Sequence, residues 1–213
     1  MDAFGITYEQ ALKDKSVYNA IDACEVLGVD AKGLDELWAT CKKSKFGGGF
    51  YCGKIKDIYC FNAFFMSMRS GFVKPGTSIH YYVVEFPAET LAWSDFRGGV
   101  LGPTDPKAAP ADSLRGVCLA NWQALGLPFE PNVGENCVHA SASPFEGLAE
   151  RMNWMGTPVE EDPFGAALLK EGVPLDLIKA WSVDPQVKGK SIFDQLEDMD
   201  VETCKAKILE LSK

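Results

Sequence analysis

The chain has 213 residues, of which 46% are hydrophobic and 24% charged, a globular composition with room for one sizeable domain or a domain with an extension. Its formal net charge is −9, which argues against a nucleic-acid partner, because binding a phosphate backbone requires clustered Lys and Arg. No apolar run reaches the length of a membrane span and no signal-peptide pattern opens the chain, so we expect an intracellular protein, in the cytoplasm or an organelle, without a transmembrane segment.

The seven cysteines are an odd number and include no CxxC or CxxH pair. Their spacing therefore argues against a zinc ribbon and against a secreted disulfide scaffold. We expect reduced, buried thiols.

The first 45 residues are predicted to be helical. Apolar residues recur at helical spacing over residues 8–12 and 17–27, and residues 31–41 repeat the pattern. The basic run at residues 41–45 is interpreted as a solvated helix end, with a phosphate contact as the alternative.

The next part of the chain is predicted to contain a connector, a helix and a strand. Residues 46–51 are glycine-rich without the G-K-[ST] of a P-loop, which favours a flexible connector. Residues 58–68 are apolar and aromatic and are predicted to form a buried helix. Residues 78–86, SIHYYVVEF, are the best strand candidate, because β-branched and aromatic residues dominate them. His80 is interpreted as a packed or edge residue of that strand. A short helix or turn is expected at residues 90–96.

A glycine-containing loop, LGPT at residues 101–104, follows Arg97 and two further glycines. Glycine and threonine let a backbone approach a phosphate closely, and Arg115 offers a guanidinium suited to bidentate phosphate recognition. From residue types alone, a surface salt bridge is the alternative for Arg115.

The segment that follows places a histidine between a strand and a helix. Residues 136–138 are predicted to end a short apolar strand, and His139 comes next among small residues. Ser143 and Glu146 match a capping box, with a proline at the first helical position. Apolar residues then recur at i, i+3, i+4 and i+7, which predicts an amphipathic helix. This stripe consists of Phe145, Leu148, Ala149 and Met152.

The small neighbours of His139 leave its imidazole uncovered, which suits a reactive group. The alternative is a hydrogen-bonded core or turn histidine. Ser141 and Ser143 are equally interpretable as turn and cap residues.

Residues 157–213 are predicted to form a helical C-terminal extension. Four short helices are expected, at residues 166–169, 175–181, 191–196 and 201–211. Three acidic residues are interpreted as a solvated loop and helix cap rather than as a metal site. They are Glu197, Asp198 and Asp200.

Two segments together resemble the nucleoside diphosphate kinase family. Residues 136–150 begin with NCVHASASPFE, end with a glutamate, and are similar to the family's active-site motif N-I-I-H-G-S-D-S with its following helical glutamate. Residues 100–106, VLGPTDP, and 113–116, SLRG, are similar to its V-M-L-G-x-T-[ND]-P and [ST]-[IL]-R-G segments. The motifs occur in the family's order, and the resemblance covers roughly residues 51–154.

The resemblance implies an α+β protein with a partial or divergent ferredoxin-like nucleoside diphosphate kinase fold. The chain would then comprise a helical N-terminal segment (residues 1–45), a kinase-like core (46–156) and the helical extension (157–213). The family's K-P-D motif, whose lysine contacts phosphates, has no counterpart here. The family's first and second strands also have no counterpart, because residues 1–45 are predicted to be helical in their place. Either the chain begins inside a longer ancestral enzyme, or another polypeptide supplies what is missing.

The resemblance also implies roles for individual residues. His139 would attack the γ-phosphorus of a nucleoside triphosphate and pass the phosphoryl group to a nucleoside diphosphate, with Glu150 and Ser141 orienting its imidazole. Mg²⁺ would be the cofactor, bound through the nucleotide phosphates, and no metal ligands are expected from the protein. The nucleotide-binding residues would be Thr104, Arg115, Asn136, Arg97 and Tyr59, the last as the candidate base-stacking ring.

Three functions remain open at this point. The first is an active nucleoside diphosphate kinase, whose partners are nucleoside di- and triphosphates. The second is a non-catalytic structural subunit built on a truncated kinase fold, whose partners are copies of itself or other subunits of a larger assembly. The third is a helical binding module in which the motif matches are coincidental.

Overall fold

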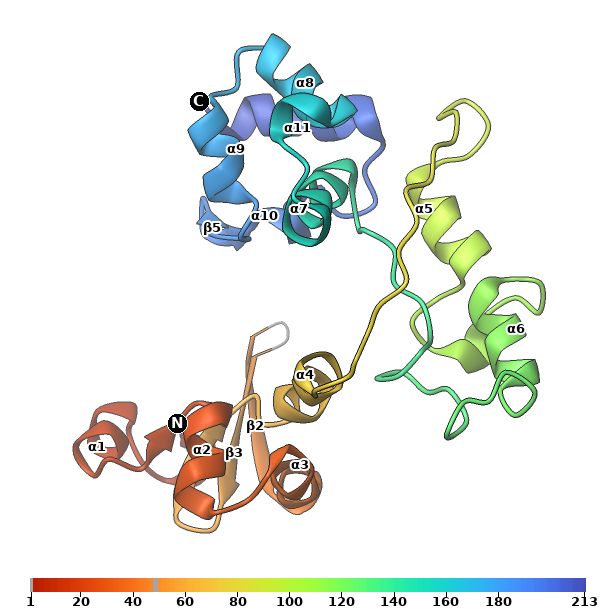
Figure 1. The fold of residues 1–213 in the computed structure, drawn as a ribbon. Coiled ribbons are helices and arrows are strands. Elements are labelled where there is room, and N and C mark those ends of the chain that lie inside the picture. The colour runs from red at the N-terminus through yellow and green to blue at the C-terminus, as the bar shows by residue number, and fades with distance from the viewer. Residues whose placement is uncertain (1, 48–49) are drawn as a thin grey trace. The chain divides into compact units, whose positions relative to one another are not determined.

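The computed structural model describes residues 2–47 and 50–213. It divides into two compact units, an N-terminal unit (Met1–Tyr82) and a C-terminal unit (Val83–Lys213) (Figure 1). The protein is of mixed α/β type, with helices in both units and a small mixed sheet in the first. Neither predicted domain boundary, at 45/46 or at 156/157, coincides with this division.

The N-terminal unit is a four-stranded sheet with helices packed against it. Strand order is β1-β4-β3-β2, with β1 parallel to β4 and the other neighbours antiparallel. The helices are η1 (Asp2–Phe4), α1 (Tyr8–Lys13), α2 (Ala20–Leu27), α3 (Ala31–Thr40) and α4 (Phe65–Val73), and the strands are β1 (Val17–Tyr18), β2 (Lys42–Gly47), β3 (Phe50–Ile55) and β4 (Ile58–Phe61).

Strand β4 is buried on both faces, and this explains one wrong prediction. Ile58 and Cys60 face the core formed with α2 and α3, whereas Tyr59 packs against Ala11 of α1 and the ring of Phe4 on the other face. A strand covered on both sides is continuously apolar, so its sequence does not alternate. The helix predicted over residues 58–68 is therefore a strand followed by a separate helix.

A hairpin occupies the stretch where a helix end and a connector were expected. Residues 42–45 lie in β2 and pair with β3, so the basic run is strand rather than helix end. Residues 48 and 49 of the predicted connector lie outside the described residues, and the residues flanking them are in strands. Gly53 on β3 admits the ring of Trp38, because a Cβ there would lie 2.4 Å from Trp38 Cζ3.

Residues 78–86 are extended but form no strand, so the strand predicted there is wrong. These residues have a high β-propensity, but no neighbouring strand forms backbone hydrogen bonds with them among the described residues. Propensity alone is not sufficient for a strand to form. Tyr82 is 85% exposed and Val83 is 57% exposed.

The C-terminal unit is mostly helical. Its helices are α5 (Trp93–Asp95), the π-helical turn η2 (Phe96–Leu101), η3 (Pro106–Ala108), α6 (Leu114–Asn121), α7 (Pro144–Met155), η4 (Val159–Glu161), α8 (Pro163–Lys170), α9 (Leu175–Trp181), α10 (Ile192–Leu196) and α11 (Val201–Leu211), with a small hairpin of β5 (Gln186–Val187) and β6 (Lys190–Ser191). The short helix expected at residues 90–96 and the four expected in the tail are confirmed, with α8 beginning three residues earlier than predicted.

Helix α7 begins as its sequence predicts. The hydroxyl of Ser143 accepts a hydrogen bond from the N–H of Glu146 at 3.1 Å, and Pro144 occupies the first helical position. The Glu146 carboxylate accepts from the N–H of Ala142 at 2.5 Å, one residue before the usual capping-box partner. Gly156 ends the helix in the left-handed conformation (φ 66°).

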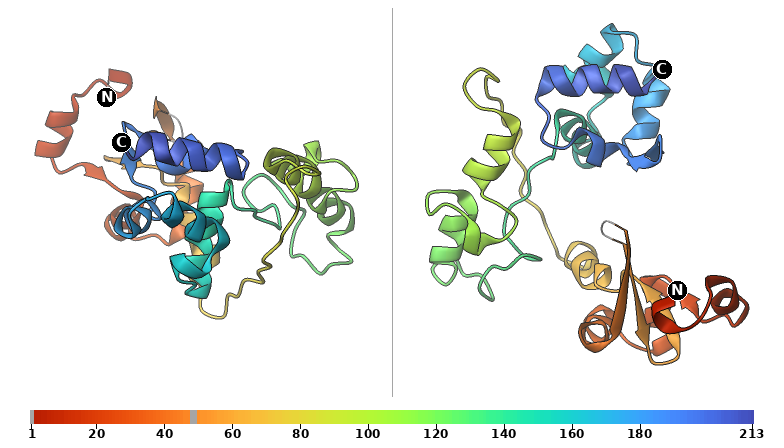
Figure 2. Two further views of the ribbon diagram at one scale, coloured as in Figure 1. Left: turned by 90° about the horizontal axis from the view of Figure 1, so that it is seen from above. Right: turned by 180° about the vertical axis from the view of Figure 1, so that it is seen from behind.

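The apolar stripe of α7 packs into the core formed by helices α8 to α11 (Figure 2). Phe145 and Leu148 are at most 1% exposed and contact the same cluster as Leu168, Ile178 and Ile208. Because α7 shares its core with the tail, residues 157–213 are not a separate extension. No helix among the described residues is both long and apolar enough to cross a membrane, and the seven cysteines are all free thiols.

Candidate functional site

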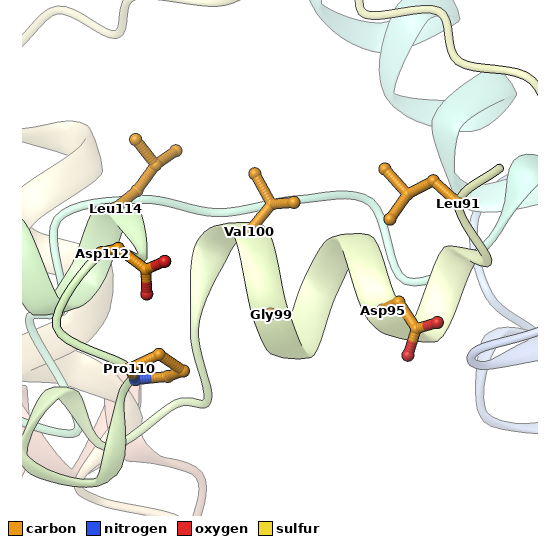
Figure 3. A pocket seen from close by; sticks show the side chains of 7 residues that line it. All are labelled: Leu91, Asp95, Gly99, Val100, Pro110, Asp112 and Leu114. Carbon is orange, nitrogen blue, oxygen red and sulfur yellow. The ribbon is translucent and has the colours of Figure 1, made fainter.

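An open groove of about 500 Å³ lies in the C-terminal unit, between η2 and the start of α6 (Figure 3). Leu91, Val100 and Leu114 give it an apolar lining, and its charged groups are the carboxylates of Asp95 and Asp112. Two carboxylates repel an anionic ligand, and none of the predicted site residues lines the groove. The candidate site is elsewhere.

Two of the predicted catalytic side chains, His139 and Ser141, both contact the third, Glu150. His139 Nε2 is 2.6 Å from Oε1 of Glu150, and the hydroxyl of Ser141 donates to the other oxygen of the same carboxylate. Both oxygens of Glu150 are therefore engaged by residues of the loop that precedes α7. The loop and the helix together fix the orientation of the imidazole.

The hydrogen bond between His139 and Glu150 shifts the pKa of each group so as to favour its charged form. The hydrogen bond to Glu150 raises the pKa of His139 above its ordinary value, against the opposing effects of burial and of the Arg97 charge. Burial by itself raises the pKa of Glu150, but the hydrogen bonds from His139 and Ser141 outweigh it and leave that pKa below its ordinary value. Glu150 is thus an ionised acceptor near neutral pH.

An ionised Glu150 decides which imidazole nitrogen carries the proton. A carboxylate accepts and does not donate, so Nε2 carries the hydrogen and Nδ1 of the neutral ring holds a free lone pair. Among the described residues, Nδ1 has no hydrogen-bond partner, and the side chain is 66% exposed. Nδ1 is therefore the imidazole nitrogen whose lone pair is not used by the protein.

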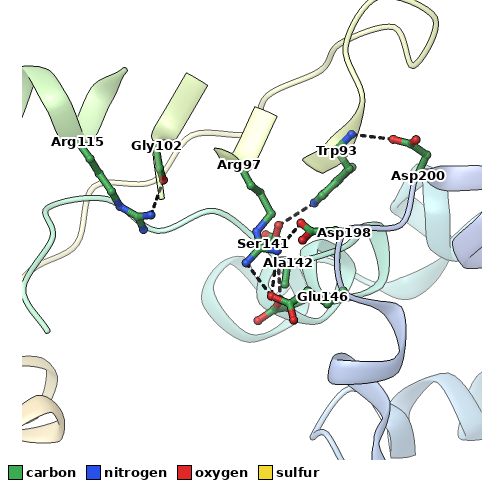
Figure 4. Close-up of polar contacts among 10 residues, drawn as sticks. Trp93, Arg97, Gly102, Arg115, Ser141, Ala142, Glu146, Asp198 and Asp200 are labelled. Atoms are coloured by element: carbon green, nitrogen blue, oxygen red, sulfur yellow. Dashed lines mark hydrogen bonds and ion pairs between the residues drawn. The ribbon is translucent and has the colours of Figure 1, made fainter. Parts of the chain in front are cut away.

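Segments far away in the sequence hold the loop of His139 in place (Figure 4). The indole N–H of Trp93 donates to the carbonyl of Ser141 at 2.8 Å, and the N–H of Asp198 donates to the carbonyl of Ala142 at 2.9 Å. The backbone N–H of Trp93 donates to a carboxylate oxygen of Asp200 at 2.7 Å. The loop is therefore fastened to α5 on one side and to the α10–α11 connection on the other.

Arg97 lies on the π-helical turn, one helical turn beyond Trp93, and is paired with acidic residues of the tail. Its guanidinium is 2.5 Å from Asp198 and 3.1 Å from Glu197. Burial alone lowers the pKa of Arg97, but these two carboxylates raise it overall. The acidic residues predicted to form a solvated loop and cap are half-exposed and also anchor Arg97 and the loop of His139.

Arg115 connects the two motif segments. Its guanidinium donates to the carbonyls of Gly102 and Val138, each at 2.7 Å. Its Nε is buried without a hydrogen-bond partner. Burial, followed by the nearby charge of Arg97, lowers the pKa of Arg115. The structure thus gives Arg115 a definite task in holding the glycine loop against the segment before His139.

Asn136 makes a second connection between the same segments. Its amide donates to the carbonyl of Thr104 at 3.1 Å. The side chain of Thr104 is free of protein hydrogen bonds among the described residues, and the residue is exposed. Sequence segments about 30 residues apart are thus brought together, by side chains that donate to backbone carbonyls.

The strand predicted over residues 136–138 is wrong. These residues form an irregular segment in which Cys137 has a positive φ of 75°, which no strand residue adopts. The hydrogen bonds that a strand would make to a neighbour are replaced here by the contacts from Arg115 and Asn136. The segment is positioned by side chains rather than by a sheet.

Tyr59 does not join the site. It lies in the N-terminal unit, in the core of β4, where it is 6% exposed and packs on Phe4. A ring enclosed in this way cannot stack on a nucleotide base, so the predicted role is wrong for this residue. The other seven predicted site residues all lie in the C-terminal unit.

Glu146 belongs to the site, although sequence analysis assigns it only a capping role. Burial raises its pKa, with the charge of Glu150 adding to the effect and the hydrogen bond from Ala142 opposing it. One nitrogen of His139 and one oxygen each of Glu146 and Glu150 all lie within 4.8 Å of one another. The i, i+4 spacing of the two glutamates on α7 is the signal that predicts their shared face.

Comparisons with protein-family models, with curated proteins and with solved structures returned no match.

Proposed function

We propose that this protein transfers the γ-phosphoryl group of a nucleoside triphosphate to a nucleoside diphosphate through a phosphohistidine at His139, as nucleoside diphosphate kinases do. The observation that carries the proposal is the contact of His139 Nε2 with Glu150 at 2.6 Å, which leaves the Nδ1 lone pair free on a side chain that is 66% exposed. The resemblance of residues 100–116 and 136–150 to that family supplies the substrate class.

The first step is an attack by the Nδ1 lone pair on the γ-phosphorus. The bond from that phosphorus to the bridging oxygen breaks, and the nucleoside diphosphate leaves with the electron pair. The phosphorylated imidazole is cationic, and the Glu150 carboxylate 2.6 Å from Nε2 stabilises this positive charge. The second step reverses the first with a terminal phosphate oxygen of another nucleoside diphosphate as the nucleophile.

Glu150 is a positioning residue in this scheme, and Ser141 positions Glu150. The hydroxyl of Ser141 occupies one carboxylate oxygen, so the other remains directed at Nε2. This arrangement holds the ring before the nucleotide arrives, and preorganisation of this kind is the main source of catalysis in phosphoryl transfer.

The positive charge of Arg97 acts on His139 and lowers its pKa, which makes Arg97 a candidate to contact the phosphates. Its present partners, Glu197 and Asp198, are side chains that are about half exposed, and a triphosphate carries more negative charge than either. We expect the phosphates to displace one of these carboxylates from the guanidinium. Mg²⁺ bound to the phosphate oxygens would neutralise the remaining charge.

The proposal is tested by a transfer assay with purified protein. Chain incubated with Mg²⁺, γ-labelled ATP and unlabelled GDP should produce labelled GTP, and His139→Gln should abolish the product. His80→Gln is the matched control, because His80 is the only other histidine and lies in the exposed segment outside the site. Absence of labelled GTP with the folded wild-type protein would contradict the proposal.

A second candidate, a structural subunit of a larger assembly, is favoured by an uncovered apolar surface on α4. No residue of this helix is buried, and its side chains at i, i+3 and i+7 form one exposed stripe. Phe65, Met68 and Phe72 are 51%, 50% and 68% exposed.

Light scattering on the purified chain, with Phe72→Glu for comparison, tests this candidate. A mass above 23.3 kDa that falls in the variant would support a self-associating surface. If the α4 stripe needs a partner to cover it, the chain alone should self-associate or aggregate. A wild-type chain that is monomeric and soluble at high concentration would therefore contradict an obligate subunit role.

A further inference from the structure

We infer that His139, Glu146 and Glu150 form a binding site for a zinc-class divalent cation that competes with phosphorylation of His139. The inference has two parts. Binding depends on the three side chains alone, whereas the competition rests on the proposed phosphoryl transfer.

The donor set suits a transition metal. One imidazole nitrogen and two carboxylate oxygens lie within 4.8 Å of one another, and all three come from the loop before α7 and its first two turns. An imidazole ligand favours Zn²⁺ and its neighbours in the transition series over Mg²⁺ or Ca²⁺, which prefer oxygen. Three protein ligands with an open fourth position are the arrangement found in catalytic zinc sites.

The distances are close to those that a common ion requires. Donor atoms that each lie about 2.1 Å from a tetrahedral ion are about 3.4 Å from one another. In the structure the pair formed by His139 and Glu150 is shorter than this, at 2.6 Å, and the widest separation in the set is no more than 4.8 Å. The side chain of His139 is 66% exposed, so the imidazole has room to move away from Glu150 as an ion enters.

Supporting contacts would hold the ligands in place. Glu146 accepts the N–H of Ala142 with one oxygen, and Glu150 accepts the hydroxyl of Ser141 with one oxygen. The other oxygen of Glu146 is left for the ion, and the other oxygen of Glu150 becomes available once the ion displaces the Nε2 hydrogen of His139 that it accepts. A carboxylate that is already held by a hydrogen bond loses less conformational freedom when it binds an ion. Hydrogen-bond partners of metal ligands, here the Ala142 N–H and the Ser141 hydroxyl, commonly contribute to metal affinity.

Metal binding and phosphorylation exclude each other through the position of one proton. Without metal, Nε2 carries the hydrogen that Glu150 accepts, and the Nδ1 lone pair is available. A metal at Nε2 displaces that hydrogen and binds the Nε2 lone pair, so the neutral ring must carry its hydrogen on Nδ1. An Nδ1 that bears a hydrogen has no lone pair for the attack on phosphorus.

Binding is tested with Zn²⁺ added to the full chain and followed by titration calorimetry and by ¹⁵N spectra of the two imidazoles. We expect one site that involves histidine, with the His139 signal changing from the Nε2–H to the Nδ1–H form and the His80 signal unchanged. Glu146→Gln should weaken this site by roughly 100-fold, because the loss of even an outer partner typically costs 10- to 100-fold. Glu160→Gln, an exposed glutamate of η4, is the matched control and should bind as the wild type does.

Other outcomes separate the two parts. Zn²⁺ that binds equally well to His139→Gln is held by thiols elsewhere and overturns the inference, as does an unchanged affinity in folded Glu146→Gln. The Nδ1–H signal with Zn²⁺, in a chain that never forms phosphohistidine, supports the metal site and contradicts the proposed function. Phosphohistidine formation that Zn²⁺ does not reduce, at concentrations that saturate the site, overturns the competition.

Discussion

The carboxylate of Glu150 lies 2.6 Å from Nε2 of His139, and the two residues are joined across the start of helix α7 rather than along one face of it. The capping contacts of Ser143 fix where the helix begins. They therefore also fix how far along the helix axis Glu150 lies from the loop that carries His139. The local signal that starts the helix therefore positions a contact between residues 11 positions apart.

Glu150→Gln should move the pH dependence of His139 to lower values. Glu150 raises the pKa of His139, so its removal lets that pKa fall, and the neutral, nucleophilic form then predominates from a lower pH. The rate of phosphorylation at its plateau should nevertheless fall about 100-fold, because the charge that stabilises the cationic intermediate is lost.

Imidazole NMR titration and the rate–pH profile, in buffers stripped of trace transition metals, check this prediction. Glu160→Gln is the control and should reproduce the wild-type midpoint. A midpoint in Glu150→Gln that equals or exceeds that of the wild type would show that the carboxylate does not act on the imidazole.

Arg115→Met should destabilise the C-terminal unit by about 2–3 kcal/mol. The substitution leaves the carbonyls of Gly102 and Val138 without their charged donor, and hydrogen bonds to charged groups contribute about 1.5–3 kcal/mol each in favourable cases. Urea unfolding followed by tryptophan fluorescence measures the loss. A free energy of unfolding equal to that of the wild type would contradict the prediction. The contact between the two segments would then not depend on Arg115, and phosphate binding would remain as the proposed role of its guanidinium.

Gly116→Ala should be among the most damaging small substitutions in the chain. A Cβ at Gly116 would lie 2.0 Å from the carbonyl oxygen of Pro110, a backbone atom that cannot move aside cheaply. We expect a loss of about 3 kcal/mol, the upper end of the usual cost of overpacking. Gly99→Ala is the control, because its Cβ meets no atom within 4 Å. Equal melting temperatures of the two variants would contradict the packing of α6 described here.

Trp93→Phe should loosen the loop of His139 at a modest cost in stability. The change keeps most of the ring but removes the N–H that donates to the carbonyl of Ser141, a loss of about 1 kcal/mol. Hydrogen exchange of the amides at residues 140–142 should become faster in the variant. Unchanged exchange at these amides would show that the tail contact from Asp198 suffices to hold the loop.

The helix carrying Glu150 could be predicted from sequence because its signals are local. Ser143, the proline after it and the apolar stripe all lie within 10 residues of one another. Apolar residues at i, i+3, i+4 and i+7, over about two turns, fit the helical period of 3.6 and not the strand period of 2. The contact between His139 and Glu150 could be expected as well, but only through the family resemblance, since spacing alone does not bring a loop residue onto a helix.

The strands could not be predicted because their pairing depends on distant residues. Residues 78–86 have the strongest β-propensity but no partner, whereas β2 contains three lysines and pairs with β3. Strand β4 is buried on both faces, so its apolar run cannot be told from a helix by period. The anchors at Trp93 and Asp198 were missed for the same reason, because each contacts a residue about 50 positions away.

The central claim is that Nδ1 of His139 accepts a phosphoryl group, and the most direct measurement is the position of that group. The folded chain is incubated with Mg²⁺ and ATP, the reaction is stopped at alkaline pH, and the product is examined by mass spectrometry and by ³¹P and ¹⁵N NMR. The prediction is one acid-labile phosphoryl group on Nδ1 of His139, present in His80→Gln and absent in His139→Gln. A folded wild-type chain that carries no phosphoryl group, or carries it on Nε2, would contradict the claim.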